Sequence, residues 1–335
     1  MATINRARGG TTVPGLRLRP YAGEADIPDI VRIKNAEAEA DGLHYRTNVE
    51  ETASVLGNPS ASFEPARDIT IAEVDGRVVG MASRETVDTT DGFREHRNDG
   101  EVDPAFRRRG IGRALLAESL RRHRAFAETD PTNLPRIFGS WSWERQAGNQ
   151  ALLRGEGFET VRYFFDMVRP TLENIPKVAL PDGLTLRPIE RSMAKQVWDA
   201  DVEAFQDHWG GFDHSDEHLQ RWLDNPSTDL SIWVVAFDGD EVAGGIVNGI
   251  DAEQNAALGL QRGWLQSVFT RRPWRRRGLA TALIAESLRV LRDRGMTSAA
   301  LGVDADNPSG AFGLYEGLGF AVDARATAWR KPFQP

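Results

Sequence analysis

The chain carries the segment RRRGIGRALLAESLRR at residues 107–122 and a close copy, RRRGLATALIAESLRV, at residues 275–290. The two copies align without a gap at a spacing of 168 residues. At the same spacing LRLRP, residues 16–20, aligns with LTLRP, residues 184–188. Self-similarity at one fixed spacing indicates a duplicated structural unit. The sequence therefore predicts two homologous domains of similar length.

The stretch between the copies, RPTLENIPKVALPDG at residues 169–183, contains Pro170, Pro176 and Pro181. Proline removes a backbone donor and resists helix continuation, so this composition is typical of a linker. A chain of 335 residues also exceeds the length at which a single core usually stops growing. We place the boundary near residue 175, which predicts domains at residues 1–175 and 176–335.

The composition excludes several classes of protein. Hydrophobic residues make up 40% and charged residues 27% of the chain, as in ordinary globular domains. The lack of cysteine excludes disulfides, thiolate metal sites and a cysteine nucleophile, and fits a reducing compartment. No run approaches the roughly 20 apolar residues of a membrane span. A net charge of −8 argues against broad nucleic-acid binding. We expect a cytoplasmic monomer or homodimer with no membrane, nucleic-acid or metal partner.

Hydrophobic periodicity predicts the order of elements in the second copy. Runs rich in β-branched and apolar residues predict strands, which are LTLRPI (184–189), SIWVVAF (231–237), EVAGGIVNGI (241–250), WLQSVFT (264–270) and SAALGVD (298–304). Amphipathic spacing predicts helices, which are MAKQVWDADVEAF (193–205), DEHLQRWLD (216–224) and ATALIAESLRVLRDR (280–294). The predicted class is therefore α/β, with two tandem domains that each form a mixed, mostly antiparallel sheet with helices on both faces.

In both copies a basic loop with one glycine opens directly into a helix. The unpaired N–H groups and the dipole of a helix N-terminus attract anions, and a glycine lets a phosphate approach the backbone. Arginine adds bidentate contacts to phosphate oxygens. The pattern therefore favours a phosphate-binding loop, and a solvated basic face or a nucleic-acid patch is the alternative.

These loops resemble the signature of the GNAT superfamily of acyltransferases, which is Arg or Gln, two residues, Gly, one residue, then Gly or Ala. The matching positions are Arg107, Arg108, Arg109, Gly110, Ile111 and Gly112, and Arg275, Arg276, Arg277, Gly278, Leu279 and Ala280. The tandem arrangement resembles that of the mycothiol synthase family. The resemblance implies acetyl-CoA as the cofactor, its pyrophosphate on the loop, and the backbone of Val268, Phe269 and Thr270 facing it.

Two further positions match the family in the C-terminal copy, within GVDADNPSGAFGLYEGLGF at residues 302–320. The resemblance implies that Tyr315 protonates the thiolate that leaves when an amine is acetylated, a role typically worth about 10²–10⁴-fold in rate. It also implies that Asn307 helps to hold the cofactor. A core aromatic is the alternative for Tyr315, and Asn307 also suits a helix N-cap.

The N-terminal copy departs from the family at the position of the acid. Leu153 aligns with Tyr315, and residues 141–158 contain no tyrosine. The strand before its loop, within FREHRNDGEVDP at residues 93–104, is unusually polar. We therefore expect the N-terminal domain to be degenerate, with a supporting or cofactor-binding role, and the C-terminal domain to carry the chemistry.

The acceptor is expected to be a small molecule with a primary amine, such as an amino sugar, an aminoglycoside or a peptide amine. Glu203, Asp207 and His208 lie where family members build the acceptor pocket, although an ordinary solvated residue is the better explanation for each of them taken singly. No sequence feature identifies the general base. A catalytically silent acetyl-CoA sensor is the alternative function, and turnover with an amine distinguishes the two.

Overall fold

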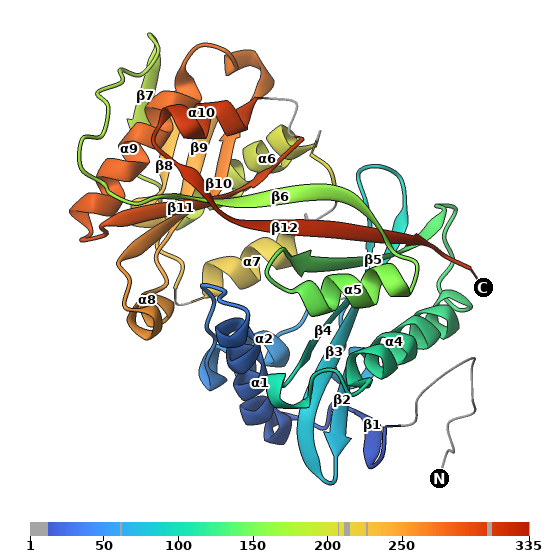
Figure 1. Ribbon diagram of the computed structural model, residues 1–335. Coiled ribbons are helices and arrows are strands. Elements are labelled where there is room, and N and C mark those ends of the chain that lie inside the picture. Colours follow the sequence, from blue (N-terminus) through green and yellow to red (C-terminus); the bar gives the residue numbers. More distant parts are fainter. Residues whose placement is uncertain are drawn as a thin grey trace. The chain divides into compact units, whose positions relative to one another are not determined.

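The computed structural model describes residues 13–60, 62–206, 208–210, 215–225, 227–306 and 310–334. These residues form two compact units, each shown in Figure 1. The first unit contains the residues up to 88, 93–159 and those from 329 onward, and the second contains 89–92 and 160–328. Across the described ranges, no helix is long and apolar enough to cross a membrane.

The first unit is a sheet in the order β1-β2-β3-β4-β5-β12. Its elements are β1 (Leu16–Pro20), α1 (Ile27–Ala40), α2 (Val49–Gly57), α3 (Pro65–Asp68), β2 (Ile69–Val74), β3 (Arg77–Asp88), β4 (Arg94–Val102), α4 (Ile111–Ala127), β5 (Arg136–Trp143) and α5 (Ala147–Gly155). Ile71 packs in one buried cluster with Ile30 of α1, and the next residue, Ala72, packs in another with Leu115 of α4. Since neighbouring strand residues face opposite ways, helices cover both faces.

The second unit continues from β12 in the order β12-β6-β11-β10-β9-β8-β7. Its elements are β6 (Glu159–Arg169), β7 (Leu184–Arg187), α6 (Ala194–Phe205), α7 (Asp216–Asp224), β8 (Val234–Asp238), β9 (Glu241–Gly249), α8 (Ala252–Leu258), β10 (Arg262–Thr270), α9 (Leu279–Asp293), β11 (Ser298–Asp304), α10 (Ala311–Gly317) and β12 (Ala321–Pro332). Val235 shares a buried cluster with Val197 of α6, whereas Ala236 shares one with Leu283 of α9. Helices again cover both faces.

The predicted fold class is confirmed, because each unit contains a parallel pair, β4 with β5 or β10 with β11, next to antiparallel pairs such as β3 with β4 or β9 with β10. The predicted bounds of α7 and β11 agree with the structure residue for residue, and residues 170–183 contain neither helix nor strand. Helix α8 was not predicted from the sequence. It begins at the cap Asp251, whose side chain accepts the N–H of Gln254, and it ends at the left-handed Gly259.

The polar strand β4 is compatible with burial because its side chains are paired. Glu95 accepts hydrogen bonds from Arg97 and Arg330 at 2.9 and 2.8 Å. His96 lies 3.2 Å from the hydroxyl of Thr86, and burial lowers its pKa to about 4. This histidine is therefore neutral at physiological pH, and folding does not bury a charge there.

The end strands of the two sequence copies are exchanged. β6, which ends the first copy, pairs with β11 in the second unit, and residues 329–332 of β12 complete the first unit beside β5. Trp329 is buried among Phe138 and Leu153, and its Nε1 donates to the Ser142 hydroxyl at 2.8 Å. Such an exchange costs little when two homologous sheets accept either strand. The units therefore differ from the halves 1–175 and 176–335.

Replacement Trp329→Ala is expected to destabilise the first unit by about 3–5 kcal/mol, the usual cost of removing a buried tryptophan. Trp329 is 2% exposed and fills the cluster behind β5. Hydrogen exchange at residues 136–143 measures the effect. Val322→Ala is the control, because Val322 lies on the same strand and is 45% exposed. Unchanged protection of β5 in Trp329→Ala would contradict the assignment of this strand end to the first unit.

Candidate active site

The two arginine loops adopt the same backbone conformation. Arg108 and Arg276 both lie in the left-handed region, with φ of 64° and 60°. Gly110 and Gly278 follow with φ of 91° and 82°, and the next residue of each begins a helix, α4 or α9. A left-handed arginine is uncommon, and the same feature at matching positions means that both loops hold one defined shape. The helix N-terminus is thereby presented at the end of the loop.

The first arginine of each cluster anchors its loop to earlier elements of the same unit. Arg107 donates to both carboxylate oxygens of Asp41, at 2.7 and 2.8 Å. Arg275 donates to the carbonyls of Thr270 and Ala204, at 2.9 and 3.1 Å. These two arginines therefore hold the loop in place, and the exposed members of the clusters are those suited to an anion, namely Arg108, Arg109, Arg276 and Arg277.

The two loops differ in how open their glycines are. A Cβ atom built on Gly278 meets nothing within 4 Å. A Cβ atom on Gly110 would lie 3.2 Å from the side chain of Val13. A phosphate therefore has free access to the backbone at the second loop, whereas an apolar side chain stands beside the first.

The sheet of the second unit contains a β-bulge that β4 of the first unit lacks. In β10 the register with β9 shifts between Leu265 and Ser267, and the pairing with β11 ends at Leu265. From Gln266 onward, the edge of β10 on the side of β11 therefore has no strand partner in the described sheet, while the other edge stays paired with β9. In the first unit, β4 pairs with β3 without a shift from Arg94 to Val102, and its pairing with β5 ends at Asn98. Bulges commonly re-aim groups at active sites, and this one was not foreseen from the sequence.

The predicted cofactor-facing residues Val268, Phe269 and Thr270 all lie on this open stretch of β10. Phe269 is buried against α6, so its contribution there is limited to backbone groups. The sequence prediction concerned the backbone, and the structure places these three residues on the stretch of β10 beyond its pairing with β11. Their role stays a prediction.

In the first unit the matching strand end is occupied by the chain's own side chains. The N–H of Val102, which aligns with Thr270, donates to a carboxylate oxygen of Glu37 at 3.0 Å. Gln146 donates to the other oxygen at 2.8 Å. Burial, together with the nearby Glu101, raises the pKa of Glu37 to about 7. The backbone N–H group at the end of β4 is therefore already bonded to a side chain of the same unit.

Tyr315 lies in α10 within the main core of the second unit. It is 5% exposed, its ring centroid lies 6.2 Å from that of Phe320, and it shares a cluster with Leu279 at the start of α9. Burial raises its pKa to about 12, so the phenol is protonated throughout the physiological range. The core packing considered as its alternative role is thus present, and it is compatible with proton donation. The matched position Asn307 lies outside the described residues.

Leu153 occupies the equivalent place in the first unit. The N–H of Phe158 donates to its carbonyl at 3.0 Å, as the N–H of Phe320 does to Tyr315 at 3.1 Å. Gly157 and Gly319 end the two helices with φ of 82° and 84°. The same helix C-cap therefore supports the alignment, and the first unit has a buried leucine where the second has a phenol.

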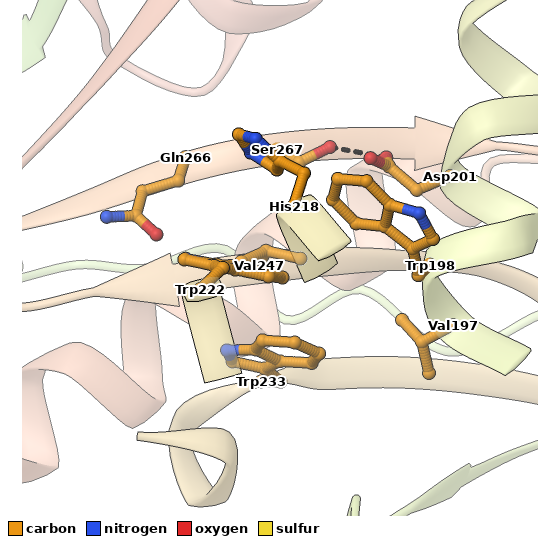
Figure 2. A pocket seen from close by; sticks show the side chains of 9 residues that line it. All are labelled: Val197, Trp198, Asp201, His218, Trp222, Trp233, Val247, Gln266 and Ser267. Atoms are coloured by element: carbon orange, nitrogen blue, oxygen red, sulfur yellow. Dashed lines mark hydrogen bonds between the residues drawn. The ribbon is translucent and has the colours of Figure 1, made fainter. Parts of the chain in front are cut away.

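A pocket of about 280 Å³ lies between α6, α7 and the sheet of the second unit, and Figure 2 shows its lining. The lining residues come from both helices, β9, the bulge and the start of β8, and they are Val197, Trp198, Asp201, His218, Trp222, Trp233, Val247, Gln266 and Ser267. Three are tryptophans. The pocket therefore meets β10 at the point where the strand edge opens.

Asp201 is the one carboxylate in this lining. The hydroxyl of Ser267 donates to its Oδ1 at 2.6 Å, as Figure 2 shows. Burial raises its pKa to about 6. Sequence reasoning missed this residue, although a signal existed: Asp201 follows the buried Val197 by four positions and so shares the inward face of the helix.

The structure places the described residues among those predicted to bind the acceptor, Glu203 and His208, outside the lining of this pocket. Glu203 is paired with Arg271 at 2.8 Å, and the ring of His208 lies 4.2 Å from that of Phe205. Neither lines the pocket. Asp207 lies outside the described residues. The pocket carboxylate is thus two residues before Glu203, on the other side of α6.

Residues 194–320 match the family model described as "Acetyltransferase (GNAT) family", and residues 65–159 match "Acetyltransferase (GNAT) domain". The chain is similar to the mycothiol acetyltransferase of Salinispora arenicola, with 30% identity over 88% of this chain and 90% of that protein. The mycothiol acetyltransferase of Thermobispora bispora is 29% identical, over 91% and 95%.

Two solved structures resemble the whole chain. A GCN5-related N-acetyltransferase from Sphaerobacter thermophilus has a TM-score of 0.73 and 25% identity, over 97% of this chain and 98% of that one. A tandem GNAT protein from the clavulanic acid biosynthesis pathway has a TM-score of 0.72 and 18% identity, over 96% and 99%. The second likeness concerns the fold alone.

Proposed function

Because the chain belongs to the GNAT family of acetyltransferases and contains two such domains in tandem, we propose that it acetylates the primary amine of a small molecule with acetyl-CoA. The chemistry is assigned to the second unit. The observation that carries the proposal is that an unpaired edge of β10, a pocket next to it and an open phosphate loop occur together in this unit.

The residues of the second loop fit the pyrophosphate of acetyl-CoA. Gly278 leaves the backbone accessible, and α9 presents its N-terminal N–H groups beside the exposed Arg276 and Arg277. A helix N-terminus and two guanidinium groups together attract a doubly charged anion. When bound there, acetyl-CoA supplies a thioester that an amine attacks directly, through a tetrahedral intermediate. Asn307 is expected to help to hold the cofactor.

The protein's own groups then act on the charges that develop. Backbone N–H groups on the open edge between Val268 and Thr270 are suited to stabilise an oxyanion, because they are fixed by the pairing of β10 with β9. Tyr315, which is protonated at neutral pH, donates its proton toward the departing sulfur. The C–N bond forms first and the C–S bond then breaks, and the proton lost by the amine leaves through a base.

The first unit is assigned a supporting role. Glu37 already accepts the N–H of Val102, Val13 stands beside Gly110, and Leu153 replaces the acid. Each feature removes a different requirement of the reaction: a free strand edge, access to the loop and a proton donor. The first unit thus keeps the fold but lacks the free strand edge, the open loop and the phenol that the second unit contains.

The proposal is tested by incubating the protein with acetyl-CoA and a panel of primary amines. We expect stoichiometric release of the CoA thiol that depends on an amine, together with a mass increase of one acetyl group on that amine. Binding of acetyl-CoA without turnover of any amine would instead support a silent sensor. Thermal stabilisation by acetyl-CoA does not separate the two, because both bind it.

A further inference from the structure

Building on the proposed function, we propose that the pocket beside Asp201 binds a primary amine carried on an apolar, aromatic body that lacks a carboxylate. Asp201 is assigned as the carboxylate that receives the ammonium group and removes its proton. The proposal concerns the chemical class of the acceptor and one catalytic residue, and it follows from the lining of the pocket.

The wall of the pocket is a continuous series of aromatic rings. Trp222 stacks on Trp233 with ring centroids 4.8 Å apart, and Trp198 lies 6.0 Å from Trp222. His218 stacks on Trp198 at 5.7 Å. Tryptophan faces attract both aromatic rings and cations, so this wall favours a flat apolar body next to an ammonium group.

The charges in the lining disfavour amines that also carry a carboxylate, such as amino acids. Among the nine described residues around the pocket, Asp201 is the one carboxylate and none is Lys or Arg. An amino acid would bring its own carboxylate beside Asp201 with no cation to pair it, and burying an unpaired charge is costly. An amine without a carboxylate meets no such penalty.

The polar groups in the lining also disfavour a polyhydroxylated acceptor. Besides the indole N–H groups of the tryptophans, the polar side chains of this lining are Asp201, His218, Gln266 and Ser267, and the Ser267 hydroxyl is already bonded to Asp201. A sugar amine would leave several buried hydroxyls without partners. At about 280 Å³ the pocket also lies near the lower end of ligand-site volumes, which suits a compact amine.

Asp201 is positioned to remove the proton that the reaction must lose. It is bonded to Ser267, which directly precedes the cofactor-facing Val268 on β10. The ammonium gives one proton to the carboxylate, and the free electron pair forms the C–N bond. The departing sulfur receives a proton from Tyr315, and the second proton that the nitrogen loses restores the phenol. Burial disfavours both the ammonium and the carboxylate, so it brings their pKa values closer together.

The lining contains other polar groups besides Asp201. They are His218 from α7 and Gln266 and Ser267 from β10, and the remaining lining residues are tryptophan and valine. The pKa of Asp201 is raised to about 6, first by burial, with the Ser267 hydrogen bond acting in the opposite direction. The carboxylate is therefore ionised at pH 8 and protonated below pH 6.

The acceptor class is tested with 2-phenylethylamine, phenylalanine and glucosamine as single substrates. We expect kcat/KM for 2-phenylethylamine to exceed that for each of the other two by about 10²-fold or more, because the others leave polar groups unpaired. Faster acetylation of glucosamine or phenylalanine would overturn the assigned class while leaving the acetyltransferase function in place. Failure of every amine in the wider panel would instead overturn the function itself.

The role of Asp201 is tested with Asp201→Asn, which keeps the size of the side chain. We expect kcat/KM to fall about 10²–10⁴-fold at pH 8. The ratio of wild-type to variant values should fall about tenfold between pH 8 and pH 5, because the wild-type carboxylate becomes neutral as pH drops below its pKa of about 6. A purely structural role predicts a ratio that does not change with pH.

Asp199→Asn is the matched control, because Asp199 lies on the same helix but is exposed and paired with Lys195. It should leave kcat/KM within about twofold, since an exposed ion pair contributes little. Tryptophan fluorescence adds a readout that needs no turnover: 2-phenylethylamine should change the emission of the wild type and of Asp199→Asn, and bind Asp201→Asn at least about tenfold more weakly. Equal binding and an unchanged pH ratio would refute the assignment.

Discussion

Gly278→Asp is expected to abolish measurable turnover, a loss of more than about 10²-fold, whereas Gly110→Asp retains most of it. Gly278 directly precedes the N-terminus of α9, where no other side chain approaches within 4 Å of its Cβ position. An aspartate there places a negative charge among the N–H groups that are proposed to hold the cofactor's pyrophosphate. The helix dipole stabilises that carboxylate, which therefore competes with the phosphate for the same site.

Gly110→Asp serves as the control for backbone strain. Gly110 and Gly278 have φ of 91° and 82°, so an aspartate is disfavoured equally by backbone conformation at both. The substitution at Gly110 also meets Val13 at 3.2 Å and should cost at least as much stability. Steady-state turnover, acetyl-CoA affinity by calorimetry and thermal unfolding measure the three effects. Equal losses of turnover in folded variants would contradict the division of roles between the units.

Tyr315→Phe is expected to lower kcat by about 10²-fold or more while leaving acetyl-CoA affinity unchanged. The substitution removes one oxygen and preserves the packing of the ring against Phe320 and the core. The pKa of about 12 keeps the phenol protonated, so the wild type should show no loss of activity from this group on the alkaline side up to pH 10. The same burial would disfavour the charged thiolate as it departs, so it would raise the pKa of the thiol and favour protonation of the sulfur.

Tyr163→Phe is the matched control, because Tyr163 lies in the same unit but is 44% exposed. Its turnover should equal that of the wild type. An unchanged rate in Tyr315→Phe would refute the general-acid role, provided that a pre-steady-state measurement shows chemistry and not product release to be limiting.

The duplication and the loops could be predicted because each of them depends on a local pattern of neighbouring residues. Arginine, glycine and an amphipathic run are sufficient to specify a loop that ends in a helix, and both loops adopt one conformation down to the left-handed Arg108 and Arg276. The structure shows in addition that Arg107 and Arg275 anchor the loops. Sequence spacing alone does not distinguish an arginine that binds a carbonyl from one that remains exposed.

The carboxylate in the pocket lining could not be identified in the same way. Glu203 and Asp201 belong to one helix, and both lie in an acidic run. Which one enters the pocket depends on the rotation of α6 against the sheet and on the bulge that presents Ser267. Glu203 instead points to Arg271. These are contacts between residues more than 60 positions apart, and no local pattern encodes them.

The sequence by itself determined that the chain is a tandem α/β protein with two phosphate-type loops, and that Tyr315 has a leucine as its counterpart. Local propensity, periodicity and self-similarity are sufficient for such features. Only the tertiary structure decided that β6 and β12 are exchanged, that Asp201 lies in the pocket, and that Glu37 occupies the strand end of the first unit. Homologous strands can pair with either sheet, and side chains on one helix can turn to either side, so long-range packing makes these choices.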